Sequence, residues 1–178
     1  MKTLKEVKAQ YLEKARSNRL GDYVVRDPKT GAIIASSAEP WDQPMLDGSI
    51  ITAQKLEENL FKSADGEYYA DKDLPEHDDA FCTALYAEEM RIERNRRIEL
   101  TDDYIRLPDA TVMREEGAKR EALSDAERKS VLVYREALRN MPEQKGFPFI
   151  DFPEAPDAIA YESEQAINQN QGGYSYEH

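Results

Sequence analysis

Four closely spaced prolines place the strongest constraint on how this chain can fold. They follow a stretch with helical periodicity and are Pro142, Pro148, Pro153 and Pro156. Ser124 and, three residues later, Glu127 form a capping-box pattern, which predicts that a helix begins here. Because proline cannot continue a helix interior, this helix should end near Pro142. Residues 142–156, which also carry three phenylalanines, are therefore predicted to form an extended, stiff and aromatic segment, called the strap below.

One side of the predicted helix is apolar. Its members recur at intervals of three, four and three residues and are Val131, Tyr134, Leu138 and Met141. These spacings place them on a single face, and the basic residues lie largely elsewhere. Such a stripe packs either against a partner protein or against the strap folded back over it. The sequence leaves both arrangements open.

Two blocks of residues resemble a known family. The first runs from Arg94 to Tyr104 and continues into Leu107-Pro108-Asp109, and the second runs from Tyr134 to Arg139 and on to Phe147-Pro148 and Phe152-Pro153. In this order they resemble the arginine-rich helix, TDW…LPD turn, YRQALRD helix and FP/WP pairs of caudovirus tail fibre assembly proteins, also called tail assembly chaperones. Tyr104 and Phe152 stand where that family usually has tryptophan. The resemblance covers residues 92–156 and leaves residues 1–90 unexplained.

The resemblance implies a non-enzymatic factor that binds a tail fibre or another tail protein and aids its folding, oligomerisation or attachment. Such a factor acts in the host cytoplasm during assembly. We expect the partner to contact the second block, at Val131, Tyr134, Arg135, Leu138, Arg139, Phe147, Pro148, Phe152 and Pro153. Secondary contacts are expected at Arg94, Arg97, Tyr104 and Trp41, although the same arginines could form a solvated face and Trp41 could pin its own loop.

Two other functions stay open. The long N-terminal part favours a structural virion component that is retained in the tail as an adaptor, since a simple chaperone does not need so large an additional region. Only the acidic charge favours a host-takeover protein that competes for a basic target. Self-association is a further expectation for the apolar helix faces.

Composition limits the classes of partner. The net charge of −12 argues against general binding of nucleic acid or anionic membranes, because phosphate contacts need an excess of clustered Lys and Arg. No apolar run approaches the roughly 20 residues of a membrane-spanning helix. The single cysteine, Cys82, rules out an intrachain disulfide framework and fits a reducing compartment.

The polar composition also predicts the fold class. With 34% charged residues and a mean hydropathy of −0.79, most helices should bury only one stripe each. We expect a mainly α, extended multi-helix protein with a small core, one small β-hairpin, and the strap after the last helix. Four regions are predicted: an N-terminal region over 1–78, an arginine-ended helix and turn over 79–112, the terminal helix and strap over 113–160, and a polar tail over 161–178.

Local patterns suggest the elements within these regions. They predict a helix over 3–20 that ends at Gly21, a hairpin over 23–35, a loop over 36–49, a short helix after Thr52 and a strand over 67–70. Further on they predict a long helix over 79–100 and a helix-prone linker over 113–121. Composition alone predicts a disordered tail.

We find no residues arranged for catalysis. The candidate metal ligands His77, Cys82 and His178 lie far apart in sequence, and no glycine-rich phosphate loop or nucleophile motif is present. His77 lies in an acidic loop that could touch a divalent ion only weakly, and Cys82 lies in an apolar helical stripe where a buried thiol is the usual case. We therefore predict no enzyme activity, no metal and no cofactor.

Overall fold

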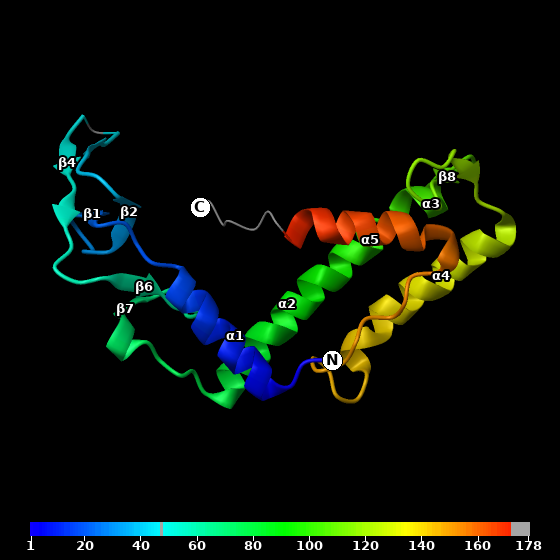
Figure 1. Ribbon diagram of the computed structural model, residues 1–178, viewed down its shortest axis with the longest axis horizontal. Coiled ribbons are helices and arrows are strands. Elements are labelled where there is room, and N and C mark those ends of the chain that lie inside the picture. Colours follow the sequence, from blue (N-terminus) through cyan, green and yellow to red (C-terminus); the bar gives the residue numbers. More distant parts are fainter. Residues whose placement is uncertain (47, 172–178) are drawn as a thin grey trace. The chain divides into compact units, whose positions relative to one another are not determined.

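A computed structural model describes residues 1–46 and 48–171 (Figure 1). Within this part the chain forms five α-helices and nine short strands, so the fold is mixed α/β rather than mainly α as expected. It divides into two compact units. The N-terminal unit comprises residues 3–82, and the C-terminal unit comprises residues 1–2 together with the chain from residue 83 onward.

The N-terminal unit begins with helix α1, Leu4–Ser17. Thr3 and Glu6 form a complete capping box, and the buried face of the helix consists of Val7, Tyr11 and Ala15. The helix ends before Gly21, which was expected to stop it. Gly21 instead lies where the chain passes the backbone of Ser37 so closely that an added Cβ would be 2.2 Å from the Ser37 carbonyl oxygen.

A three-stranded antiparallel sheet in the order β2-β1-β5 follows α1. Its strands are β1 (Tyr23–Arg26), β2 (Ile33–Ser37) and β5 (Gln54–Lys55). In the turn between β1 and β2, the carboxylate of Asp27 accepts hydrogen bonds from the backbone N–H groups of Lys29 and Thr30, both at 2.8 Å. The predicted hairpin over 23–35 is therefore confirmed.

Two further hairpins complete this unit. They pair β3 (Asp42–Pro44) with β4 (Ile50–Thr52), and β6 (Leu60–Lys62) with β7 (Tyr68–Ala70), before a 3-10 turn at Asp71–Asp73. The predicted strand over 67–70 is confirmed, whereas the helix after Thr52 and the loop spanning all of 36–49 are wrong. The backbone of β6 bonds instead to the chain that follows α1, with Leu20 N–H donating to Leu60 O at 2.9 Å and Lys62 N–H donating to Asn18 O at 3.0 Å. A local pattern cannot reveal this long-range pairing.

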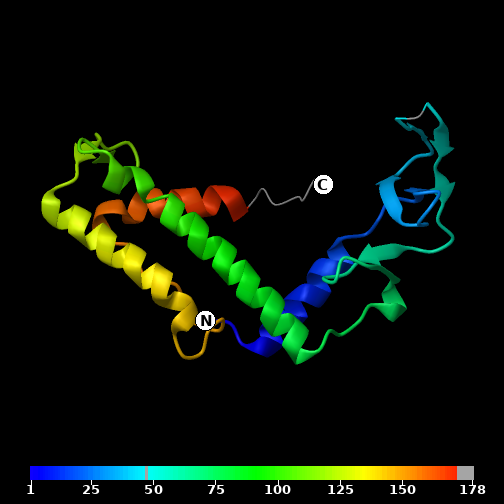
Figure 2. The ribbon, with the colours of Figure 1, turned by 180° about the vertical axis from the view of Figure 1, so that it is seen from behind.

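Helices dominate the C-terminal unit (Figure 2). They are α2 (Asp79–Glu99, whose first residues belong to the N-terminal unit), α3 (Asp102–Arg106), α4 (Asp125–Asn140) and α5 (Asp157–Gln171). A 3-10 turn, Met141–Glu143, follows α4. The predicted helix over 79–100 and the helix capped by Ser124 are confirmed. The strap, however, joins α4 to α5 and so does not follow the last helix, and it is not extended over residues 142–150, which form the 3-10 turn followed by bends and turns.

A small hairpin replaces the predicted helix-prone linker over 113–121. It pairs β8 (Thr111–Val112) with β9 (Glu121–Ala122). Gly117, within the connecting loop, has a φ of 75°, a left-handed conformation that ends helical geometry and suits glycine. The composition of the linker was helical, but its ends are held by strand pairing.

The expected disordered tail is also wrong for residues up to 171, because they form α5. Ala158, Ile159 and Ser163 lie on one side of α5 and are 5%, 0% and 8% exposed. The helix therefore gains packing energy that counting polar residues misses. Residues 172–178 of the predicted tail lie outside the described residues.

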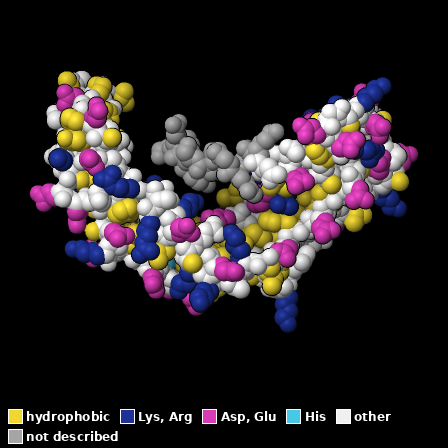
Figure 3. Space-filling view, in the orientation of Figure 1, with side chains coloured by type: hydrophobic (Ala, Val, Ile, Leu, Met, Phe, Trp, Pro, Cys, Tyr) yellow, Lys and Arg dark blue, Asp and Glu magenta, His cyan; other side chains and the backbone are white. Residues whose placement is uncertain are grey.

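The C-terminal unit has one contiguous hydrophobic core. Its buried members are Ala110, Val112, Leu123, Val131, Tyr134, Leu138, Ala158 and Ile159. Ile98, Phe152 and Ala155 pack against it from α2 and the strap. Hydrophobic side chains can be seen gathering between α5 and α4 in Figure 3. The core therefore joins α2, α3, the β8–β9 hairpin, α4, the strap and α5.

Candidate partner-binding site

Helix α4 begins with the capping box that its sequence predicts. Glu127 N–H donates to Ser124 Oγ at 3.3 Å, and Ser124 N–H donates to Glu127 Oε2 at 2.8 Å. Arg114 Nη2 lies 2.8 Å from Glu127 Oε1. The hydrogen bonds from Ser124, reinforced by Arg114, hold the pKa of the Glu127 carboxyl below its ordinary value of 4.5. This contact set fixes where α4 starts and therefore which of its faces points inward.

The apolar stripe of α4 points into the core. Val131, Leu138 and Met141 are 0% exposed and Tyr134 is 5% exposed. Burial raises the pKa of the Tyr134 phenol. Phe152 of the strap packs against the same core. Of the two arrangements that the sequence left open, the structure has the internal one, although α5 and the β8–β9 hairpin help the strap to cover the stripe.

Arg135 extends from α4 to the end of α2. Its guanidinium Nη1 donates to Ile98 O at 2.8 Å and to Thr101 Oγ1 at 2.6 Å, and it lies 2.6 Å from Asp102 Oδ1. The residue is only 9% exposed. A buried cation here satisfies a carbonyl at the C-terminal end of a helix, where the helix dipole favours positive charge. Arg135 was expected to bind carboxylate or carbonyl groups of a partner, and it binds such groups within its own chain.

Arg128 and Arg139 behave differently from each other. Arg128 donates to three backbone carbonyls, that of Tyr104 within α3 at 2.7 Å and those of Leu107 at 2.8 Å and Pro108 at 2.6 Å in the turn that follows. The LPD turn is thus held in place by α4. Arg139 lies at the surface, where its guanidinium comes no nearer than 3.6 Å to the carboxylate of Glu136.

The strap lies along α2 through three ring contacts. They are Arg97 over Phe152 at 4.1 Å, Arg91 over Phe147 at 5.5 Å, and Tyr86 stacked on Phe149 at 5.6 Å. Contacts between a guanidinium and an aromatic face are favourable by about 0.5–2 kcal/mol. Pro148 is buried, whereas Phe147, Phe152 and Pro153 are only half-buried. Each of these three leaves part of its apolar surface accessible.

The arginine cluster of α2 pairs mainly within its own helix. Arg96 and Arg97 both contact the Glu93 carboxylate, at 3.1 and 2.9 Å, and Arg94 donates to the side chain of Asn95 at 2.7 and 3.1 Å. The carboxylates of Asp102 and Asp103, which were expected as possible partners of these arginines, instead pair with Arg135 and Arg106. Arg94 and Arg97 keep part of their side chains at the surface of α2.

Trp41 lies in the N-terminal unit, before β3, and is half-buried. Its carbonyl oxygen accepts a hydrogen bond from Ala53 N–H at 2.9 Å. Its indole Nε1 is buried and has no hydrogen-bond partner among the described residues. The tryptophan therefore packs against its own unit, which is the arrangement expected if it pins its own loop.

Glu162 joins α5 to the rest of the C-terminal unit, and sequence reasoning missed it. Its carboxylate accepts hydrogen bonds from the Tyr104 hydroxyl, from Met113 N–H at 3.0 Å and from Arg120 Nη1 at 2.6 Å. Burial, reinforced by the hydrogen bond to Glu162, raises the pKa of the Tyr104 phenol. The only sequence signal was a glutamate three residues after the buried Ile159, in a segment that composition assigned to a tail.

Sequence reasoning also missed two exposed apolar residues on α4. Leu132 and Val133 are 48% and 65% exposed and lie opposite the buried stripe. In the N-terminal unit, Leu46 and Ile50 are exposed near the tip of the β3–β4 hairpin, where Figure 3 shows hydrophobic side chains. The sequence could have indicated these four exposed residues, because they are apolar but do not share the spacing of the buried residues in the same helix or strand.

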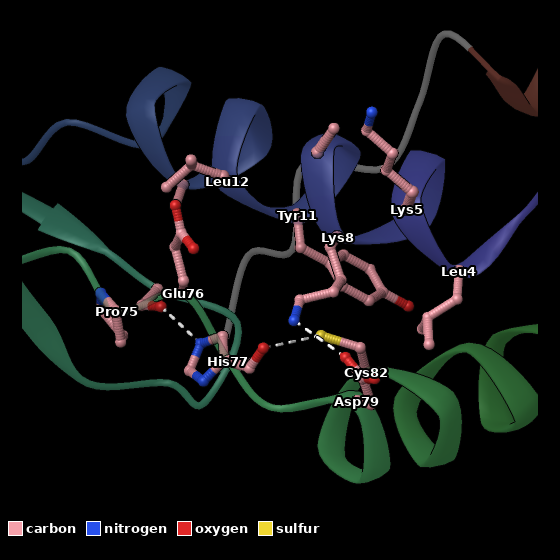
Figure 4. Close-up of a pocket in the computed structure, with 13 residues that line it drawn as sticks. Leu4, Lys5, Lys8, Tyr11, Leu12, Pro75, Glu76, His77, Asp79 and Cys82 are labelled. Carbon is pink, nitrogen blue, oxygen red and sulfur yellow. Dashed lines mark hydrogen bonds and ion pairs between the residues drawn. The ribbon is translucent and has the colours of Figure 1, made fainter.

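A pocket of about 520 Å³ lies within the N-terminal unit, between α1 and residues 75–82 (Figure 4). Lys8 Nζ lies 2.9 Å from Asp79 Oδ1, and Ser63 Oγ lies 2.9 Å from His77 Nε2. The thiol of Cys82 points into the pocket, and burial raises its pKa. A thiol with a raised pKa is a poor nucleophile at neutral pH, and the lysine is already paired with a carboxylate.

The described residues hold no cluster of three or more His, Cys, Asp or Glu side chains that could bind a metal ion. In the same part of the chain, every helix is too short or too polar to cross a membrane.

Comparison with known proteins gives one match. Residues 87–157 match a family model described as phage tail assembly chaperone protein. The matched segment contains most of α2, all of α3, α4 and the strap, and ends where α5 begins. Searches of curated proteins and of solved structures gave no match. This chain is therefore similar to the phage tail assembly chaperone family over residues 87–157, which is less than half of its length.

Proposed function

We propose that this protein is a non-enzymatic assembly factor that binds a phage tail protein, in particular a tail fibre protein, and aids its folding, oligomerisation or attachment. The family match supports a role in tail assembly within the host cytoplasm. The observation that carries the proposal further is the strap, whose aromatic side chains are held on α2 yet stay partly accessible. A surface ordered before binding loses little entropy when a partner docks.

The partner would contact Phe147, Phe152 and Pro153 on the strap, together with Arg94 and Arg97 on α2. The half-exposed rings offer apolar contact to an unfinished fibre, and the arginines offer bidentate contacts to its carboxylates. The buried Val131, Tyr134 and Leu138 would reach a partner only if the strap opened. In the structure they belong to the core against which Phe152 of the strap packs.

Recovery of tail proteins from infected cells tests this proposal. The full chain carrying an affinity tag is used to isolate bound phage proteins from lysate. Phe147→Ala combined with Pro153→Ala should lower the recovered tail protein at least about tenfold, because apolar contact residues at an interface centre carry most of the binding energy. Leu107→Ala, which changes an exposed apolar residue of the same unit, is the matched control and should leave recovery unchanged. Equal recovery with both variants would contradict the strap as the contact surface.

A structural virion component is the second candidate. It is favoured by the N-terminal unit, which has its own buried residues and lies outside the family match. An adaptor would use such a unit for permanent attachment. Quantitative mass spectrometry of gradient-purified virions against infected lysate separates the two roles. A fixed integer copy number in particles would make the protein an adaptor, whereas abundance in lysate and absence from particles would leave the transient factor.

A further inference from the structure

The outward side of α4 has a charge pattern that is complementary to itself. The six residues on this side are Asp125, Lys129, Leu132, Val133, Glu136 and Asn140, called the outer face below. All six are exposed, and at 100° per residue they fall within about 100° of the helix circumference. They lie opposite the buried stripe. Leu132 and Val133 lie halfway along the outer face, one at each lateral edge, and Lys129 and Glu136 lie between these edges, one turn before and one turn after the pair.

The positions of the charges matter because the outer face is symmetric about its centre. Lys129 lies three residues before Leu132, and Glu136 lies three residues after Val133. If a second α4 runs antiparallel to the first, with a two-fold axis between Leu132 and Val133, each Lys129 faces the Glu136 of the other copy. Leu132 then faces Leu132 of the other copy on one side of the axis, Val133 faces Val133 on the other side, and Asp125 lies opposite Asn140. A two-fold interface requires this kind of self-complementarity.

A parallel pairing is unfavourable for the same reason. It would place Lys129 opposite Lys129 and Glu136 opposite Glu136, and like charges across an interface oppose association. Lys129 has no ion pair within the described part of the chain, and the contacts of Glu136 with Arg139 and Asn140 are long, at 3.6 and 3.4 Å. Both charged groups are therefore free to pair with a second copy at little cost.

We propose that the outer face of α4 is a homodimer interface in which two copies of this chain pack antiparallel about Leu132 and Val133. The exposed apolar area is small, so the dimer is weak, with a Kd on the order of 10–100 μM. The inference does not rest on the proposed function, because it concerns the purified chain alone. A dimer would present two straps at once, which suits a multi-subunit tail protein.

Sedimentation equilibrium of the full chain tests the dimer. The protein is examined from about 1 μM to about 1 mM at an ionic strength near 0.15 M, which screens the repulsion between two chains of net charge −12. We expect a monomer–dimer equilibrium. Leu132→Asp combined with Val133→Asp should raise Kd at least about tenfold, because it places four carboxylates at the centre. Leu107→Asp is the control and should leave Kd unchanged, and circular dichroism checks that each variant is folded.

Charge exchange tests the antiparallel geometry. Lys129→Glu alone and Glu136→Lys alone should each raise Kd about tenfold, since each places like charges together twice. A mixture of the two single variants should form heterodimers, because one outer face is then acidic and the other basic. The double variant, with the two charges exchanged, should restore homodimers.

Several outcomes would overturn the proposal. A chain that is monomeric at every concentration has no such interface. A dimer that tolerates aspartate at residues 132 and 133 uses another surface. Failure of the two single variants to pair with each other would contradict the antiparallel arrangement. Loss of tail-protein recovery by the aspartate variant, with dimerisation unchanged, would assign the outer face to the tail protein instead.

Discussion

Arg135 and Asp102 form an ion pair at 2.6 Å, between α4 and the first residue of α3. The two partners differ in burial, because the arginine side chain is 11% exposed and the aspartate 54%. The carboxylate alone would remain hydrated, so the pair itself adds little stability. The larger contribution comes from the other acceptors of Arg135, Ile98 O and Thr101 Oγ1, since Thr101 is 1% exposed.

Arg135→Ala should therefore destabilise the C-terminal unit by about 1.5–3 kcal/mol, because it removes a charged hydrogen-bond donor from Ile98 O and from the buried Thr101 Oγ1. Arg139→Ala, four residues along the same helix, removes an equally long but exposed side chain and should change the free energy of unfolding by less than about 0.5 kcal/mol. Urea unfolding followed by circular dichroism compares the two variants. Similar midpoints would show that Arg135 is not a structural clamp.

Two leucines on α4 separate packing from surface exposure. Leu138 is 0% exposed, and Leu132 is 48% exposed. Leu138→Ala should cost about 2–5 kcal/mol, because it removes contacts and leaves a cavity in the core. Leu132→Ala should cost less than about 1 kcal/mol, since its side chain is already in contact with water. Thermal unfolding at low protein concentration, where dimerisation does not contribute, measures both. An equal loss of stability would mean that the stripe is not the core.

Glu162 adds polar contacts to the apolar packing that joins α5 to the rest of the C-terminal unit. Its carboxylate side chain is 16% exposed and accepts hydrogen bonds from Tyr104, Met113 and Arg120. Glu162→Ala should loosen α5 without unfolding α2 or α4, because it removes the polar contacts with α3 and the β8–β9 hairpin while Ala158 and Ile159 stay buried in the core. Amide hydrogen exchange should then speed up at least about tenfold in α5. Glu164→Ala, an exposed neighbour on the same helix, should leave exchange unchanged. Unchanged protection of α5 in the Glu162 variant would contradict this role.

Elements specified by neighbouring residues could be predicted from the sequence. Ser124 and Glu127 are three residues apart, so their reciprocal hydrogen bonds form whenever the helix forms. The hairpin over 23–35 is closed by Asp27, whose acceptors lie two and three residues away. Long helices such as α2 and α4 could also be predicted, because apolar residues recur at helical spacing along them.

Elements that depend on distant partners could not be predicted. Residues 60–62 have helical spacing with Leu56, but they are strands because they bond to the chain at Asn18 and Leu20. Residues 157–171 have a polar composition, yet they form a helix because Ile159 packs into the core and Glu162 accepts hydrogen bonds from other parts of the unit. In both cases tertiary contacts outweigh the local preference.

The candidate site shows the same limit. Periodicity placed Val131, Tyr134 and Leu138 on one face but said nothing about what covers that face. In the structure the chain covers it, and the accessible apolar groups are on the strap and on the outer face at Leu132 and Val133. A stripe read from sequence identifies a buried surface, whereas a partner surface requires knowing which apolar groups remain uncovered.

The capping box of α4 should make the stability of the C-terminal unit depend on pH in the acid range. The pKa of Glu127 is lowered in the folded protein from 4.5, chiefly by hydrogen bonds from Ser124. Because the folded protein binds this proton less readily than the unfolded chain, the carboxylate's contribution is fully present above pH 4.5 and is lost as the pH falls through the folded value. Carbon-13 NMR titration of the Glu127 carboxyl measures the shift directly.

Ser124→Ala should return the pKa of Glu127 toward 4.5 and destabilise the unit by about 1 kcal/mol at neutral pH. Glu127→Gln keeps an acceptor for the cap but cannot titrate. The stability of this variant should therefore decline less than that of the native protein as the pH falls below about 4.5. Parallel decline of the two proteins would assign the acid dependence to other carboxyl groups.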